Sequence, residues 1–246
     1  MEWRVELVGD KLDLKEVQKQ LPSGKYQVIE EEDKFYLKSP AFVDLKDSTE
    51  VREKAEEIVA LLNGAAKLTI GLIKPITING LVGIKDDGKK DVFVTVSNSV
   101  TIRYKILSPT ILVSPNSSPP EKSKVQRFLE LAERDDKVAQ TLKIINKNTK
   151  MDYYPLLYNL FEIVQGDMGS KITEMGWASK NEIERFSQTA VSPKILGLEA
   201  RHAVQKHLPP KKPMFLPEAR RFIRELLLKW LEYKWKQGQT VNRTTN

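Results

Sequence analysis

The hydrophobic positions in residues 1–107 follow two different periods. A period of two in "WRVELV", "ITINGLVGI", "DVFVTVSN" and "VTIRYKIL" predicts strands, because successive side chains of a strand point to opposite faces. Helical spacing through Val51, Ala55, Ile58 and Leu62 predicts a helix over "DSTEVREKAEEIVALLNGAAKL", which opens with a serine or aspartate cap. The segment "DLKEVQKQL" predicts a shorter helix, and "KYQVIEEEDKFYLKS" predicts two strands around an acidic turn.

The expected order of elements is strand, helix, strand, strand, helix, strand, with further strands after it. This order favours an α+β domain with a mixed or mainly antiparallel sheet and helices on one face, and a ferredoxin-like arrangement is one candidate. Because such folds carry many unrelated functions, the fold class alone predicts no function.

Residues 123–237 show helical spacing in one segment after another, which predicts an all-α helical bundle. We expect one helix in "MDYYPLLYNLFEIVQGD", with a cap at Asp152, Pro155 in its first turn and its end at Gly166. Another helix should begin at the capping-box pair Ser179 and Glu182.

Two more helices are expected near the end of the chain. The segment "SPKILGLEARHAVQKH" predicts a helix with Ser192 as its cap and Pro193 in the first helical position, ending at or just after His207. The last segment, "LPEARRFIRELLLKWLEYKW", has an apolar stripe that includes Trp230, and we expect this side chain to be buried.

The composition also predicts where the domains end. Residues 108–122 lie in "LSPTILVSPNSSPPEKS", where prolines exclude a helix and interrupt any sheet ladder, and we interpret them as an interdomain linker rich in proline and serine. The α+β domain is then expected over residues 1–107 and the helical bundle over residues 123–237. A disordered tail is expected over residues 238–246.

Cysteine is absent and the chain holds only two histidines, so we expect no metal site and no cofactor. Charged residues from the second position onward argue against a secretory signal, and no apolar run approaches the ~20 residues that span a bilayer. These features predict a soluble cytoplasmic protein without a membrane partner.

The formal charge of +7 comes from the second half of the chain. Residues 1–122 carry 18 Lys and Arg against 19 Asp and Glu, whereas residues 123–246 carry 22 against 14. A basic surface favours an anionic partner such as nucleic acid, although a modest excess of charge is also common on surfaces that are charged only for solubility.

Both histidines lie in "LGLEARHAVQKHLPP", where His202 directly follows Arg201 and five residues separate Arg201 from His207. An arginine and a histidine separated by four to six residues, on a late helix of a basic bundle, resemble the signature of the HEPN superfamily (higher eukaryote and prokaryote nucleotide-binding). The resemblance covers roughly the helical half. It implies a metal-independent endoribonuclease of bacterial defence or toxin systems, often a dimer whose two signatures meet across the interface.

The resemblance assigns Arg201 to the signature arginine, His202 to the polar position after it and His207 to the signature histidine. Metal-free RNA cleavage needs proton transfers, which suit His207, and a cation on the phosphorane oxygens, which suits Arg201. On a regular helix, six residues advance about 600° and leave these two side chains about 120° apart. They converge only if the helix end unwinds at His207 or a second protomer supplies the partner. Further candidates for contacts with nucleic acid are Lys206, Lys211, Lys212, Arg220 and Arg224.

A structural explanation of the same residues is also open. Lys206 and His207 would sit at a helix C-terminus because the helix dipole favours cations there, and Arg201 would pair with a carboxylate one turn away. A solvated helix face would account for Arg220 and Arg224. The stretch "ARHAVQKHLPPKKPMFLPEARRFIRELLLKWL" also resembles uncharacterised bacterial proteins, and this second resemblance carries no function.

Three hypotheses remain, from different classes of protein. The first is a HEPN-like ribonuclease of a bacterial stress or defence response, with RNA as substrate and a homodimer as its assembly. The second is a noncatalytic adaptor whose two domains bind different partners. The third is a nucleic-acid-binding protein that uses its basic bundle with little sequence preference.

Overall fold

A computed structural model describes residues 1–85, 87, 89–96, 100–106, 122–147, 151, 153–202, 204 and 208–244. For residues 94–96, 100–106 and 240–244 the description covers the backbone alone. The chain divides into two compact units, Met1–Glu130 and Leu131–Asn246.

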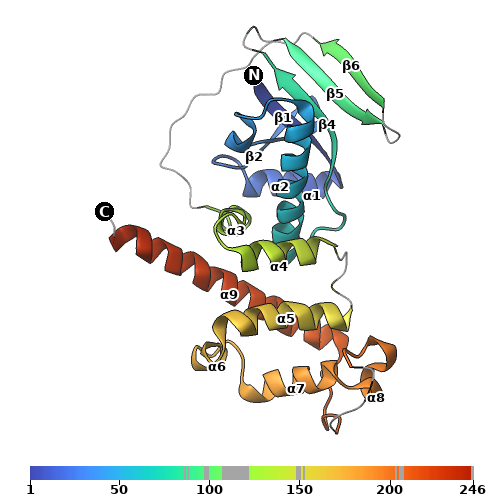
Figure 1. Cartoon of the computed structure of the whole chain (residues 1–246), viewed down its shortest axis with the longest axis vertical. Coiled ribbons are helices and arrows are strands. Elements are labelled where there is room, and N and C mark those ends of the chain that lie inside the picture. The colour runs from blue at the N-terminus through green and yellow to red at the C-terminus, as the bar shows by residue number, and fades with distance from the viewer. Residues whose placement is uncertain are drawn as a thin grey trace. The chain divides into compact units, whose positions relative to one another are not determined.

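The first unit contains a six-stranded sheet in the order β2-β3-β1-β4-β5-β6, and every neighbouring pair is antiparallel. The first four strands and two helices follow the βαββαβ order of ferredoxin-like folds, which confirms the expected α+β class, and β5 and β6 extend the sheet beyond β4 (Figure 1). The elements are β1 (Glu2–Val8), α1 (Lys11–Gln20), β2 (Gln27–Glu31), β3 (Lys34–Lys38), the 3-10 helix η1 (Pro40–Phe42), α2 (Ser48–Thr69), β4 (Thr77–Ile84), β5 (Lys90–Val96) and β6 (Val100–Ile106).

Local sequence signals begin α1 and α2. The carboxylate of Asp10 accepts hydrogen bonds from two backbone N–H groups in the first turn of α1, and Asp47 does the same for α2. The connection from α2 to β4 is fixed by a reciprocal pair of 2.8 Å hydrogen bonds between the buried side chain of Asn63 and the backbone of Ile76. Asp13 accepts two further bonds from the backbone of this connection.

The two faces of the sheet differ in character. Trp3, Val5 and Leu7 alternate along β1 and are buried. The opposite face carries charged side chains, where Arg4 lies between Glu2 and Glu31, at 2.9 and 2.5 Å from their carboxylate oxygens.

The division between the units lies after the predicted linker. Apart from Lys122, the predicted linker over residues 108–122 lies outside the described residues. Ser123 donates a hydrogen bond to the carbonyl of Gln20, and the Gln126 amide donates one to the carbonyl of Ser23 at 3.3 Å. Most of α3 (Lys124–Ala132) therefore belongs with the first unit, whereas we expected the helical region to be separate from residue 123 onward.

The second unit is all-α, as expected. Its longest helix, α9, continues to Thr244, so a helix occupies most of the stretch for which we predicted a disordered tail. A single glycine, Gly238, does not end α9, and it lies against the guanidinium of Arg134. The helices are α4 (Asp136–Lys147), α5 (Tyr154–Met168), α6 (Lys171–Glu174), α7 (Lys180–Ala190), α8 (Pro193–Leu196), the 3-10 helix η2 (Gly197–Glu199) and α9 (Leu216–Thr244).

The boundaries of α5 and α7 test three local predictions. The capping box of Ser179 and Glu182 is confirmed at the start of α7. The predicted end of α5 at Gly166 is wrong, because the helix continues to Met168 and is followed by Gly169. Asp152 lies outside the described residues, and Tyr153 occupies the N-cap position without a side-chain hydrogen bond.

The side chain of Trp230 is fully buried, as predicted. Its indole nitrogen takes part in a network of charged side chains. Its indole Nε1 donates to Asp167 Oδ2 at 2.9 Å. The same carboxylate accepts from Lys137 and Lys234 at 2.8 Å, and Lys234 also pairs with Asp135. Burial opposes ionisation of Asp167, but the hydrogen bonds from Lys137, Lys234 and Trp230 outweigh it and lower the pKa of this group to about 2.

We predict that Trp230→Ala lowers the free energy of unfolding by about 3–5 kcal/mol, the range for truncating a large aromatic side chain in a core. Chemical denaturation measures the change. Trp230→Phe removes the bond to Asp167 and one of the two indole rings but keeps an aromatic ring in the core, so it should cost less than Trp230→Ala. Leu198→Ala, at a fully exposed position, is the control and should leave stability unchanged. A wild-type midpoint for Trp230→Ala would contradict its place in the core.

The depressed pKa of Asp167 predicts an acid-sensitive contribution to stability. Because its folded-state pKa is about 2 against a usual value of 3.8, the contribution is present above pH 3.8 and is lost as the pH falls towards 2. Asp167→Asn should therefore flatten the dependence of unfolding free energy on pH in this window and lower stability at neutral pH. Glu184→Gln, in an exposed 3.9 Å pair with Lys180, is the matched control. If the unfolding free energy of Asp167→Asn fell as steeply as that of the wild type between pH 3.8 and 2, the result would contradict the network.

Candidate functional site

The segment that carries the candidate catalytic residues is not one helix. After Ser192 and Pro193, which take the predicted cap and first helical positions, α8 ends at Leu196. Gly197 follows with φ +58°, a backbone conformation that glycine adopts readily and that ends the α-helix. The 3-10 helix η2 leads to Ala200 in extended conformation, so the predicted continuous helix up to His207 is wrong over residues 197–202.

Three contacts hold Arg201 against α5 and α7. Its backbone N–H donates to the carbonyl of Ala190, at the end of α7, at 2.9 Å. Its guanidinium pairs with the carboxylate of Glu162 and lies over the ring of Tyr158, 4.6 Å from the ring centroid. Because Tyr158 and Glu162 are four residues apart on α5, one turn of this helix presents both groups to Arg201.

The ring of Tyr158 is itself fixed from behind. It stacks on Phe186 of α7 at a centroid distance of 6.1 Å, and Phe186 stacks in turn on Tyr154 at 5.8 Å. The planes in each of these pairs differ by 20° or less. Arg201 therefore continues a stack of aromatic rings that begins in the core and reaches the surface.

The guanidinium of Arg201 is accessible. Its side chain is 37% exposed and that of Glu162 is 42% exposed. The hydrogen bond that Arg201 donates to Glu162 raises the pKa of Arg201, and the guanidinium is charged at every physiological pH. His202 is exposed beside it, whereas Lys206 and His207 lie outside the described residues.

The remaining candidate cations are spread over a second segment and over α9. Lys211 and Lys212 are exposed, and Arg224 is exposed on α9. Arg220 is half-buried and donates from Nε to the carbonyl of Met151 at 3.2 Å. Arg201 contacts Glu162 and Tyr158 whereas Arg220 bonds to Met151, so these two cations have different partners.

Residues 208–215 include Lys211 and Lys212 and lead into α9. Contacts with α7 and α5 hold this connection in place. Arg185 forms a forked pair with Glu218 at 2.6 and 2.8 Å and also donates to the carbonyls of Lys212 and Pro213. The hydroxyl of Thr189 accepts from the backbone N–H of Met214 at 3.1 Å. Lys211 and Lys212 are therefore presented from a connection with a fixed backbone.

The structure adds Glu162 and Tyr158 to the candidate site. Neither was predicted, because both lie in the middle of an apolar helix and no local pattern links them to a residue far along the chain. A carboxylate partner for Arg201 was one of the structural expectations. It comes from α5, however, rather than from the turn next to Arg201.

Among the described residues, no three His, Cys, Asp or Glu side chains are grouped as metal ligands would be. None of the helices in the described ranges is both long and apolar enough to cross a membrane. No family model matches the chain, and no match is found among curated proteins or among solved structures.

We predict that Arg201 and Glu162 stabilise the second unit as a coupled pair. Arg201→Ala should lower the free energy of unfolding by about 1–2 kcal/mol, because it removes a part-exposed ion pair and a cation–π contact. A double-mutant cycle with Glu162→Ala should give a coupling energy of about 0.5–1 kcal/mol. The exposed pair of Lys180 and Glu184 is the control and should show a coupling near zero. Additive effects at Arg201 and Glu162 would contradict the pairing.

Proposed function

We propose that the protein is a metal-independent endoribonuclease that acts on single-stranded RNA, with Arg201 as the cation of its active site. One observation supports this above the alternatives: a permanently charged guanidinium is accessible at the surface, and its orientation is fixed by Tyr158 and Glu162, next to the exposed His202. Fixed orientation matters because a preorganised cation stabilises developing negative charge without a reorganisation cost.

The proposed reaction is an internal transfer at phosphorus. A base removes the proton of the 2′-hydroxyl, the 2′-oxygen forms a bond to phosphorus, and the bond from phosphorus to the 5′-oxygen breaks as that oxygen receives a proton. The products are a 2′,3′-cyclic phosphate and a 5′-hydroxyl. Arg201 would neutralise the phosphorane oxygens and His207 would transfer protons, while the carboxylate of Glu162 and the imidazole of His202 are further proton acceptors at the site.

The broken helix supports this assignment in one respect. On a regular helix the side chains of Arg201 and His207 would point about 120° apart, and this constraint does not hold once the chain leaves helical geometry at Gly197. From the HEPN resemblance we propose a cytoplasmic homodimer that serves a bacterial stress or defence response. Cations of the second unit would hold the RNA backbone, for which the candidates are Lys206, Lys211, Lys212, Arg220 and Arg224.

A noncatalytic adaptor is the second candidate, and the ion pair itself favours it. Arg201 already has a carboxylate, a ring and a backbone partner, which is what a residue needs to fasten a loop onto a bundle. Two separate compact units also suit a protein that joins two partners. In this case Arg201 would contribute to stability and to no reaction.

The decisive experiment incubates the purified full chain with single-stranded RNA in the presence of a chelator. We expect cleavage by the wild type, and Arg201→Ala or His207→Ala should reduce the rate at least about a hundredfold, the scale of lost general acid–base or electrostatic catalysis. Arg221→Ala, which removes an exposed arginine of α9 outside the site, should cleave at the wild-type rate. Circular dichroism would establish that each variant is folded.

The outcomes separate the three classes of function. Equal cleavage by His207→Ala and the wild type would refute the ribonuclease mechanism. A folded wild type that neither cleaves nor binds RNA would support the adaptor. RNA binding that weakens steeply with salt, without cleavage, would identify a nucleic-acid-binding protein.

A further inference from the structure

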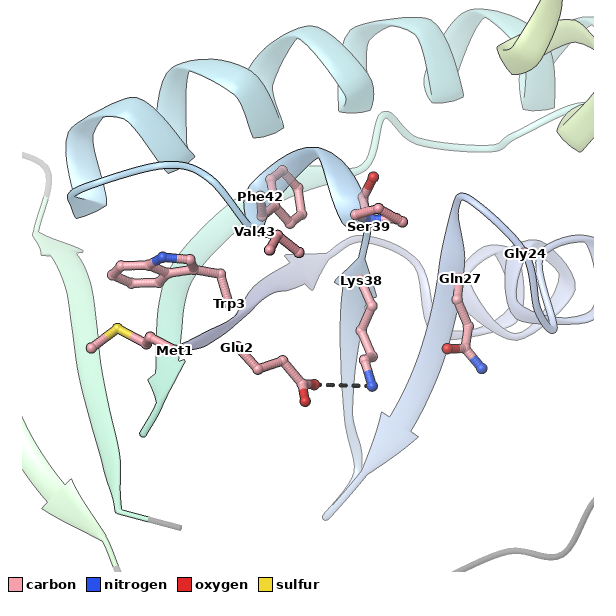
Figure 2. A pocket seen from close by; sticks show the side chains of 10 residues that line it. Met1, Glu2, Trp3, Gly24, Gln27, Lys38, Ser39, Phe42 and Val43 are labelled. Atoms are coloured by element: carbon pink, nitrogen blue, oxygen red, sulfur yellow. Dashed lines mark ion pairs between the residues drawn. The ribbon is translucent and has the colours of Figure 1, made fainter. Parts of the chain in front are cut away.

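The first unit contains a pocket of about 390 Å³ on the sheet, at the starts of β1 and β2 and the end of β3 (Figure 2). The 3-10 helix η1 closes one side of it. The volume falls within the range of about 300–1,000 Å³ that is typical of small-molecule sites. Because the pocket lies entirely in the first unit, a ligand proposed for it does not rest on the proposed ribonuclease.

The apolar part of the pocket is formed by Trp3, Phe42 and Val43. Trp3 is only 6% exposed and packs on Phe93 at a centroid distance of 5.6 Å, and Phe42 is 1% exposed. Val43 is 67% exposed and stands at the edge of the pocket. Of these three side chains, Val43 therefore provides most of the accessible apolar surface, and the two buried rings pack within the wall.

An ion pair of opposite charges lies on the other side of the pocket. Lys38 Nζ is 2.9 Å from Glu2 Oε1, as the dashed line in Figure 2 marks. Arg4 Nε donates to the same oxygen at 2.9 Å. Both cations contact Oε1, so these contacts leave Glu2 Oε2 available as an acceptor, and Lys38 has two N–H groups beyond the one used by Glu2.

Both members of the pair remain reachable and charged. The side chains of Glu2 and Lys38 are 47% and 31% exposed. Burial raises the pKa of Glu2, but hydrogen bonds from Lys38 and Arg4 outweigh this and lower it overall, so the carboxylate is ionised at neutral pH. The pocket thus offers one free anionic acceptor and one cationic donor beside an apolar wall.

The loop at the far side of the pocket is held in place. Gly24 lines the pocket and lies against the side chain of Gln126, which also donates to the carbonyl of Ser23 at 3.3 Å. The amide of Gln27 donates to the carbonyl of Pro22 at 2.9 Å, which leaves its oxygen as a further acceptor in the pocket. The walls are therefore fixed before any ligand binds, which reduces the entropy cost of binding.

We propose that this pocket binds a free α-amino acid with an apolar side chain. The ammonium group would donate to Glu2 Oε2, the carboxylate would accept from Lys38 Nζ, and the side chain would lie against Val43 at the edge of the pocket. A zwitterion matches both charges of the pocket at once. A ligand with a single charge would satisfy one member of the ion pair and leave the other facing an uncharged group.

Titration calorimetry with the full chain tests the proposal, using L-leucine and L-phenylalanine as probes. Two analogues keep the leucine side chain and lose one charge each: 4-methylpentanoate lacks the ammonium group and 3-methylbutylamine lacks the carboxylate. We expect saturable binding with Kd of ~1 mM or tighter for an amino acid, a modest affinity for a ligand of this size. Each analogue should bind at least about tenfold more weakly, the usual loss for a hydrogen bond to a charged group.

Substitutions in the pocket test whether the ligand binds there. Lys38→Met and Glu2→Gln should each weaken binding at least about tenfold, and Val43→Asp, at an exposed position, should weaken it without affecting the fold. Lys11→Met removes a cation of the same unit from an exposed pair with Asp33 at 3.1 Å and should bind as the wild type does. Thermal denaturation establishes that each variant is folded.

Three results would overturn the proposal. The first is no saturation by either amino acid at ~10 mM, a concentration well above the expected Kd. The second is equal affinity for the amino acid and a singly charged analogue. The third is wild-type affinity in Lys38→Met or in Val43→Asp, which would place the ligand elsewhere on the chain.

Discussion

The second unit depends on the stacking of aromatic rings between α5 and α7. Tyr154 and Tyr158 lie one turn apart on α5, and both stack on Phe186 of α7. At one end of this stack the hydroxyl of Tyr154 donates to the carbonyl of Met214 and fastens the connection into α9. At the other end Arg201 lies over Tyr158 and fastens the segment after α8. This one packing arrangement therefore positions both the segment that carries Arg201 and the connection that carries Lys211 and Lys212.

Local sequence patterns predicted most of the fold and little of the candidate site. Period-two and helical spacing are imposed by burial of one face, and a capping box requires only residues within one turn, so the strand and helix order and the start of α7 were predictable. The end of the helix before Arg201 was missed because the backbone of Gly197 overrides the helical spacing around it. Glu162 was missed because its partner lies 39 positions later in the chain, at Arg201, and only the tertiary fold brings them together.

The two units present charge to solvent in different ways. On the sheet face of the first unit, anions and cations alternate, as in the chain of contacts from Glu31 through Arg4 and Glu2 to Lys38, so this surface has little net field. In the second unit, Lys211 and Lys212 stand next to each other with exposed side chains. A surface of paired charges recognises ligands that carry both signs, whereas adjacent cations attract anions at longer range. The contrast supports different ligands for the two units.

A phosphate that binds Arg201 has to break its ion pair with Glu162. The free energy that this costs depends on how exposed the pair is. A buried pair of this kind would cost about 3–5 kcal/mol to break, and no phosphate group would gain access to Arg201 without disrupting the bundle. At 37% and 42% exposure the two side chains are largely solvated, and pairs of this kind contribute about 0–1 kcal/mol. A phosphate with two oxygens for the guanidinium forms a bidentate contact that outweighs this contribution. If a phosphate took the place of the Glu162 carboxylate, the ring of Tyr158 and the backbone bond to Ala190 would still hold Arg201, so the ion pair is compatible with phosphate recognition.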